Sequence, residues 1–60
     1  MPDAALLSPE ALADYLAVPV KTVYNWRSAG KGPRGIKVGR HVRFRMIDVQ
    51  AWLEQNADAA

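Results

Sequence analysis

The first apolar stripe along the chain has the spacing of a helix. Ser8 stands just before it and can accept a hydrogen bond from one of the first free N–H groups of a helix. Leu7 and Leu12 occupy the two positions of a hydrophobic staple, the contact that fixes how the chain enters a helix. The pattern therefore predicts a short helix over residues 9–16, held by packing rather than by intrinsic propensity. Its apolar stripe consists of Leu12, Tyr15 and Leu16 at i, i+3 and i+4.

Pro19 separates this helix from a second one, because proline removes a backbone donor and disfavours helical geometry in the residue before it. The second helix is predicted over residues 20–28, with Gly30 at its C-terminal cap. Val23 and Trp26 form one stripe, which we expect to face the first helix. The opposite stripe is polar, contains one aromatic residue and has no acid: Lys21, Tyr24, Asn25 and Ser28.

Residues 36–45 alternate between apolar and polar side chains around Gly39, which predicts a β-hairpin. A two-residue turn starting at Gly39 would pair Ile36 with Arg43 and mix the two faces. A three-residue tip starting at Gly39 would pair Ile36 with Phe44 instead. We favour the three-residue tip or an equivalent bulge, because it separates apolar from basic side chains. The apolar face would hold Ile36, Val38, Val42 and Phe44, and the opposite face Lys37, Arg43 and Arg45.

The last predicted element is a third helix that begins at Asp48, a good N-cap residue, and ends near Gln55. Ile47 and Trp52 would then occupy the staple positions. The apolar stripe of this helix consists of Val49, Trp52 and Leu53.

Together these elements predict an α+β, mainly helical fold, a winged helix-turn-helix with three short helices and one two-stranded β-hairpin wing. We expect one domain over residues 7–55, a flexible leader over 1–6 and a flexible tail over 56–60. No apolar run approaches the roughly 18–20 residues that a membrane span needs, so we expect no membrane partner.

A chain of 60 residues buries little surface, so its core is marginal. There is no cysteine and only one histidine, His41, so we expect neither a disulfide nor a metal, and no cofactor. The sequence also lacks a nucleophile-and-base set and a glycine-rich phosphate loop, which argues against an enzyme. Trp26 and Trp52 could serve as stacking platforms for single strands, but their places on apolar stripes favour the core. The expected core residues are Leu12, Tyr15, Leu16, Val23, Trp26, Phe44, Trp52 and Leu53.

Charge is strongly segregated along the chain. Residues 1–19 and 46–60 each carry a net charge of −3, whereas residues 20–45 carry eight basic residues and no acid. A block of this kind creates a local positive field that attracts a polyanion. The pattern therefore favours nucleic-acid binding over a merely solvated basic face. A third interpretation is a module that binds an acidic protein partner, which predicts weak DNA binding without sequence preference.

The second helix is the candidate reader of a DNA major groove, where base edges present a distinct pattern of donors and acceptors. Asn25 suits a bidentate contact with adenine, and Lys21 suits guanine or phosphate. Thr22 can offer its hydroxyl to phosphate or its methyl group to thymine, while Tyr24 and Arg27 are expected to meet the DNA backbone. The alternative is that this stripe is only the solvated face of an amphipathic helix. The candidate DNA-binding residues of this helix are Lys21, Thr22, Tyr24, Asn25, Arg27 and Ser28.

The hairpin is the second candidate contact element. Arg40 at its tip suits a narrow, A·T-rich minor groove, where the negative potential is enhanced. For Arg43 and Arg45 the alternative roles are surface solubility or pairing with acids of the third helix. The candidate DNA-binding residues of the hairpin are Lys37, Arg40, His41, Arg43 and Arg45.

The stretch from residue 7 to residue 53 resembles the small winged-helix group that includes phage excisionases and the DNA-binding heads of MerR-type regulators. The resemblance implies that the second helix reads the major groove and that the hairpin tip reaches the neighbouring minor groove or the DNA backbone. Pro19 departs from the pattern, because many relatives have serine or a similar helix cap there. The matching segments are Leu7–Leu16, Val18–Trp26, Ile36–Phe44 and Asp48–Leu53.

The resemblance implies the function of an excisionase, a recombination directionality factor that binds attachment-site repeats, bends the DNA and promotes excision by an integrase. A lone small domain should bind weakly, so useful affinity would come from several copies side by side on repeated sites. The expected partners are therefore double-stranded DNA, neighbouring copies of the chain and a phage integrase.

The alternative is a small MerR-like transcription regulator that binds promoter repeats. MerR-type regulators continue into a dimerising helix and an effector domain, which these 60 residues do not include, so we expect no ligand sensing by that route. The lack of cysteine agrees with the cytoplasm of a bacterial host, where the protein would associate with the nucleoid.

Overall fold

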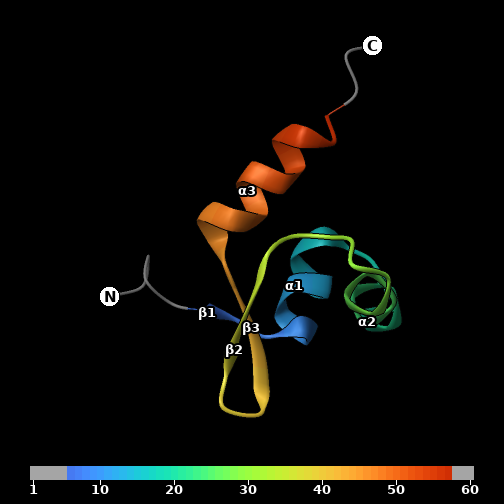
Figure 1. Cartoon of the computed structure of the whole chain (residues 1–60). Helices are drawn as coiled ribbons and strands as arrows, with labels where there is room; N and C mark the ends of the chain where they lie inside the picture. The colour runs from blue at the N-terminus through green and yellow to red at the C-terminus, as the bar shows by residue number, and fades with distance from the viewer. Residues whose placement is uncertain (1–5, 58–60) are drawn as a thin grey trace.

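The computed structural model describes residues 6–57, which form three helices and a three-stranded antiparallel sheet (Figure 1). This α+β arrangement confirms the predicted winged helix-turn-helix. The strand order in the sheet is β1-β3-β2, so β3 is the central strand. The tip of the hairpin and the end of α3 lie at opposite ends of the molecule (Figure 1). The elements in chain order are β1 (Leu6–Leu7), α1 (Pro9–Leu16), α2 (Val20–Ala29), β2 (Gly35–Val38), β3 (His41–Arg45) and α3 (Met46–Gln55).

Helix α1 has the bounds and the cap that the sequence predicts. The Oγ atom of Ser8 accepts a hydrogen bond from the backbone N–H of Ala11 at 3.0 Å, which satisfies one of the free donors at the helix start. Leu12 is fully buried, and Leu7, its staple partner, packs against the same core. The helix ends at Ala17, which adopts a left-handed conformation with φ +59°.

Helix α2 extends one residue beyond its predicted end and closes with Gly30 as a left-handed C-cap at φ +72°. As expected from its side chain, Pro19 stands at the N-cap without a side-chain hydrogen bond. Val23 is only 1% exposed and packs in the core, and Trp26 is half-buried against it. The four residues of the opposite stripe are all exposed, as predicted: Lys21, Tyr24, Asn25 and Ser28.

The predicted three-residue hairpin tip is wrong. Val38 pairs with His41 across a two-residue turn, Ile36 pairs with Arg43, and Gly35 lies opposite Phe44. Gly39, the first central residue of the turn, has φ +63°, whereas Arg40, the second, does not have a positive φ. This combination is typical of a type II′ turn.

Packing on the core favours the observed register over the predicted one, which would have separated apolar from basic residues. Phe44 is 1% exposed, and its strand partner Gly35 leaves room for neighbouring side chains: a Cβ atom there would lie 2.7 Å from Nη1 of Arg27 and 3.3 Å from Cγ1 of Val42, so both would have to shift. Lys37 therefore shares a face with Val42 and Phe44, and not with the arginines of β3 as predicted. Val38 falls on the other face and is 47% exposed.

The short strand β1 was not predicted, and it adds a third strand to the expected two-stranded wing. Leu6 pairs with Arg45, and Leu7 pairs with Phe44. Two residues are too few to show an alternating pattern, so the sequence carries no signal for this strand. Residue 6 thus belongs to the sheet, whereas the rest of the predicted leader, residues 1–5, lies outside the described residues.

Helix α3 begins two residues earlier than predicted, because Arg45, and not Asp48, is its N-cap residue. Asp48 is instead the third residue of the helix and pairs with Arg45. The staple positions shift accordingly to Phe44 and Val49, which are both buried. The predicted staple is therefore wrong, and Ile47 is 69% exposed. The helix ends at Gln55 as expected, and residues 58–60 of the predicted tail lie outside the described part of the chain.

The core is smaller and more aliphatic than predicted. Tyr15 and Leu53 are exposed at 52% and 37%, so neither belongs to it. Trp26 and Trp52 are half-buried and pack on each other, with ring centroids 5.0 Å apart and ring planes at 52°. This pair joins α2 to α3. The buried hydrophobic residues are Leu12, Ala13, Val23, Phe44 and Val49.

Candidate nucleic-acid interface

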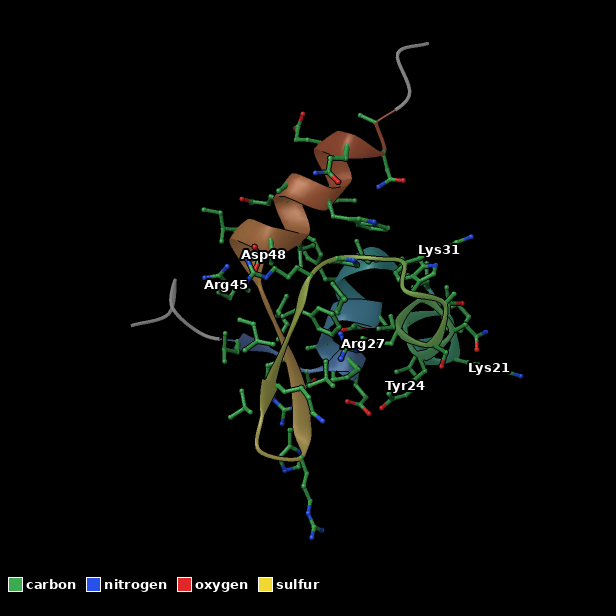
Figure 2. The ribbon with its side chains drawn as sticks, viewed as in Figure 1. Lys21, Tyr24, Arg27, Lys31, Arg45 and Asp48 are labelled. Carbon is green, nitrogen blue, oxygen red and sulfur yellow. The ribbon has the colours of Figure 1, made fainter. Side chains whose placement is uncertain are left out.

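The polar stripe of α2 is free to meet another molecule along its length. Asn25 lies in the middle of it, is exposed, and has two amide donors and an acceptor to offer a base edge. Lys21 projects outward near the start of the helix (Figure 2). Thr22 is half-buried on the shoulder of the stripe, so only part of its side chain is available. The stripe ends at the exposed hydroxyl of Ser28.

Tyr24 connects this stripe to the first turn of α1. Its hydroxyl donates a hydrogen bond to Oε2 of Glu10 at 3.1 Å, and this bond raises the pKa of Tyr24. The pKa of Glu10 is lowered, mainly by a hydrogen bond with its own backbone and further by the Tyr24 hydroxyl and the charge of Arg43. Glu10 is therefore a charged acid beside the recognition stripe, held between two helices and the hairpin.

The side chain of Arg43 lies near Glu10 and Tyr24, along the part of the β3 edge that β1 leaves uncovered. Val38 and His41 close the turn as a hydrogen-bonded pair, so Val42 points its carbonyl away from β2 and towards the outer edge. On that edge β1 covers only the end of β3, from Phe44 onward. Nη1 of Arg43 donates to the Val42 carbonyl at 2.8 Å, which holds the guanidinium along the edge.

A cleft of about 290 Å³ opens where α1, α2 and the hairpin meet. It brings together side chains from both predicted contact elements, because Tyr24 of α2 faces it together with three basic residues of the hairpin. Apart from Glu10, its polar lining consists of groups that can donate hydrogen bonds to a phosphate. The lining residues are Pro9, Glu10, Tyr24, Arg40, His41, Val42 and Arg43.

Three of the predicted site residues lie away from both this cleft and the polar stripe of α2. Arg45 donates to Asp48 from Nε at 2.7 Å and from Nη2 at 3.1 Å, and Figure 2 places this pair at the base of α3, across the molecule from α2. The pair raises the pKa of Arg45 and lowers that of Asp48. Arg27 points back towards the hairpin, where its guanidinium lies beside Gly35. Lys37 is exposed on β2, on the face of the hairpin opposite to Arg43.

Two features of this surface were missed by sequence reasoning. Lys31 was part of the basic block but not a named contact, and it projects outward on the same side of the molecule as Lys21 (Figure 2). Glu10 was assigned only to the acidic first segment, and nothing in the sequence links it to Tyr24, which is 14 positions away. Only the packing of α1 on α2 brings the two side chains together.

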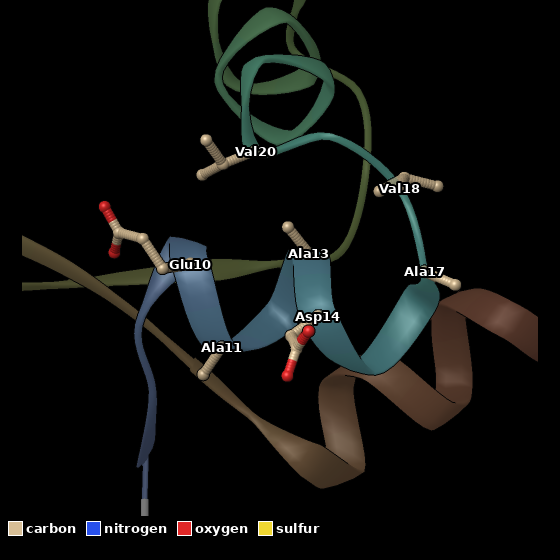
Figure 3. A pocket seen from close by; sticks show the side chains of 7 residues that line it. All are labelled: Glu10, Ala11, Ala13, Asp14, Ala17, Val18 and Val20. Atoms are coloured by element: carbon tan, nitrogen blue, oxygen red, sulfur yellow. The ribbon is translucent and has the colours of Figure 1, made fainter.

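A larger hollow on α1 does not have the chemistry of this site. This open groove, of about 690 Å³, runs between the outer surface of α1 and the start of α2 (Figure 3). Among the described residues its charged side chains are Glu10 and Asp14, and the rest of its lining is alanine and valine. Glu10 lines the cleft as well, so the two hollows adjoin, and the second carboxylate, that of Asp14, makes the groove the less favourable of the two for a polyanion.

The described residues include no cluster of histidine, cysteine and acid side chains that could hold a metal ion. Among the same residues, no helix is both long enough and apolar enough to cross a membrane.

A tight pair of helices, an exposed polar stripe on the second helix and a basic hairpin beside it define a winged helix-turn-helix domain. The chain belongs to a family of helix-turn-helix domains, whose family model matches residues 6–57. This family includes small excisionase-like proteins. Membership indicates DNA binding, and proteins of this kind are typically not enzymes. Searches of curated proteins and of solved structures found no significant match.

Proposed function

We propose that this protein is an architectural DNA-binding protein of the excisionase type, which binds attachment-site repeats, bends the DNA and promotes excision by an integrase. One observation carries the DNA-binding part of this proposal. Tyr24 of the polar stripe of α2 and the basic hairpin face a single cleft, lined by Tyr24 from one side and by Arg40 and Arg43 from the other. A rigid surface of that shape can follow a duplex from one groove across the backbone into the next.

In the proposed complex, α2 lies in the major groove, which is about 12 Å wide and admits a helix. Asn25 and Lys21 face the base edges, because both are exposed on the polar stripe. The hairpin crosses the phosphate backbone, and Arg40 at its tip enters the neighbouring minor groove. Arg40 suits this role because it occupies the second central position of the exposed two-residue turn.

The dimensions of the domain favour action by several copies. Its longest axis measures 39 Å, which is close to one turn of duplex DNA at about 34–36 Å. Because α3 lies outside the proposed interface, one copy would contact less than one turn of duplex and gain few phosphate contacts, so adjacent copies on repeated sites would supply the affinity. Bending by such an array would bring distant integrase sites together.

Asn25→Ala tests the recognition helix. We expect a loss of about 1–3 kcal/mol in binding to the cognate site and relaxed discrimination against mismatched bases, because a bidentate base contact is removed. Fluorescence anisotropy with cognate and scrambled duplexes measures both effects. Gln50→Ala is the matched control, since Gln50 is an exposed amide on α3, outside the proposed interface. Equal losses on both duplexes would refute base reading by Asn25.

Arg40→Ala tests the hairpin, with Arg45→Ala as a control that removes the same charge from the opposite side of the molecule. We expect Arg40→Ala to weaken binding and to reduce the induced bend, and Arg45→Ala to change the bend little because Arg45 is paired with Asp48. Circular-permutation gel shifts report the bend. An unchanged bend and affinity in Arg40→Ala would remove the hairpin from the interface.

An in vitro recombination assay with the cognate integrase tests the finer role. We expect the protein to stimulate excision and to depress integration, and a footprint to show repeated sites in the attachment DNA. No effect on either reaction, together with binding at a promoter, would instead assign the protein as a small MerR-like transcription regulator. Weak binding without sequence preference would favour an acidic protein partner.

A further inference from the structure

Glu10 is an acid in a cleft that otherwise presents hydrogen-bond donors and positive charge. Its carboxylate accepts the Tyr24 hydroxyl at 3.1 Å and lies within the field of Arg43. Glu10 is exposed, so burial does not explain its place. Its position in the first turn of α1 does stabilise that helix, but any rotamer pointing to solvent would serve the helix equally well.

A hydroxyl donor beside a guanidinium is the arrangement with which proteins bind a backbone phosphate. In the free protein the carboxylate of Glu10 accepts the Tyr24 hydroxyl, as a phosphate oxygen would, and the charge of Arg43 acts on it without a direct bond. The guanidinium of Arg43 is held at the edge of the cleft by its bond to the Val42 carbonyl. The Tyr24 hydroxyl and the Arg43 guanidinium thus already face the cleft, and in the proposed DNA-bound state the hydroxyl changes its acceptor.

We propose that this cleft binds one phosphate of the DNA backbone and that Glu10 is the internal anion which competes with it. This inference rests on the proposed DNA-binding function. When the duplex docks, Tyr24 exchanges the carboxylate for the phosphate, and the Glu10 side chain turns out of the cleft. Glu10 then acts against binding, because its charge remains near the phosphate after the exchange. Its role is to limit how tightly the domain binds any duplex.

The first measurement concerns the free protein and needs no DNA. In a Tyr15→Phe background Tyr24 is the only tyrosine, so an ultraviolet titration in the alkaline range reports its hydroxyl alone. Adding Glu10→Gln should lower the pKa of Tyr24 towards its ordinary value, since the bond to the carboxylate raises it. Far-UV circular dichroism at each pH confirms that the domain remains folded. An unchanged titration in the folded protein would overturn the Glu10–Tyr24 contact.

The second measurement is binding to a short mixed-sequence duplex, followed by fluorescence anisotropy. Glu10→Gln should bind about three- to ten-fold more tightly than wild type at low salt, as expected when a nearby like charge is removed. The gain should shrink between about 0.05 and 0.5 M salt, because screening weakens the repulsion. Asp14→Asn is the matched control: it removes the same charge one turn along α1, and its gain should be less than half as large.

The opposite sign would identify a different role. If Glu10→Gln weakens binding in a folded domain, Glu10 positions Tyr24 for DNA and does not compete with it. Equal gains in duplex affinity for Glu10→Gln and Asp14→Asn would mean that only the net charge of the domain matters, which also overturns the proposal. If wild type binds no duplex at all, the proposed function fails, and the phosphate site with it. The tyrosine titration would still establish the contact in that case, so the two failures remain distinguishable.

Discussion

Helices α1 and α3 both begin with a hydrophobic staple, yet they are stabilised in different ways. In α1 the staple of Leu7 and Leu12 is accompanied by a side-chain cap from Ser8. In α3 the staple of Phe44 and Val49 has no side-chain cap. Helix α1 also packs on α2 and on β3, whereas β3 is the main contact of α3.

The difference shows where each helix obtains its stability. Helix α1 combines local capping with tertiary packing, so the loss of the cap alone should leave it formed. Helix α3 depends on Phe44 and Val49, on the Trp26–Trp52 contact and on an ion pair in its first turn. Its exposed side includes Ile47 and contributes little to folding. Substitutions at the two helices should therefore differ in a definite order.

Phe44→Ala should have the largest effect. Phe44 is buried at the centre of the sheet, pairs with both neighbouring strands and forms the staple of α3. We expect a loss of about 3–5 kcal/mol in the free energy of unfolding, which is a large share of the stability of a domain this small. Urea denaturation followed by circular dichroism measures it. Ile47→Ala on the exposed side of α3 is the control and should stay within about 0.5 kcal/mol of wild type.

Ser8→Ala should come next, with a loss of about 1 kcal/mol, because the Ala11 N–H loses its side-chain acceptor. The same unfolding experiment reports the change. Ser8→Asp is the companion variant, since aspartate also caps a helix start, and it should retain most of the stability. A loss as large in Ser8→Asp as in Ser8→Ala would mean that the hydroxyl does not act as a cap.

Ala17→Gly should change stability in the opposite direction. Ala17 ends α1 with φ +59°, a conformation that costs a residue with a Cβ atom roughly 1 kcal/mol relative to glycine. Part of that gain is offset by the greater freedom of glycine in the unfolded chain. We expect a net stabilisation of a few tenths of a kcal/mol up to about 1 kcal/mol, visible as a higher Tm. A lower Tm would indicate that Ala17 carries no strain.

Asp48→Asn should have the smallest effect, and one that depends on pH. Arg45 lowers the pKa of Asp48 in the folded state, so this pair adds stability above the ordinary pKa of an aspartate. That contribution is lost as the pH falls through the lowered pKa. The variant should therefore be slightly less stable than wild type at neutral pH and equal to it in strong acid. A parallel difference at every pH would exclude the ion pair as its cause.

The contrast between the two helices also explains which parts of the fold could be predicted from the sequence. The start of α1 is encoded locally by Ser8 and by the staple residues around it. For α3 the sequence favours Asp48 as the cap, because aspartate caps helices more often than arginine does. The true start is set by β3, which passes directly into α3 after Arg45. A strand that runs into a helix without a loop leaves no capping signal to read.

The candidate site divides along similar lines. The exposed stripe of α2 follows from helical periodicity, so its residues could be named in advance. The register of the hairpin could not, because it depends on Gly35 lying opposite Phe44 and on the turn at Gly39. The position of Arg45 beside Asp48 follows from the start of α3, which was misplaced. Glu10 could not be found at all, since its contact with Tyr24 exists only after α1 and α2 have packed.

The contact between Trp26 and Trp52 gives the molecule a built-in optical probe. Two indole rings 5.0 Å apart and tilted by 52° couple their excited states, which should produce a paired signal in the ultraviolet circular dichroism spectrum. One ring belongs to the helix proposed to enter the DNA groove and the other to the helix at the far end of the chain. Loss of the paired signal with retained helix content would reveal α3 detaching before the rest unfolds. A change in the paired signal on adding duplex would show that DNA binding at α2 alters the packing of α2 on α3, without an attached label.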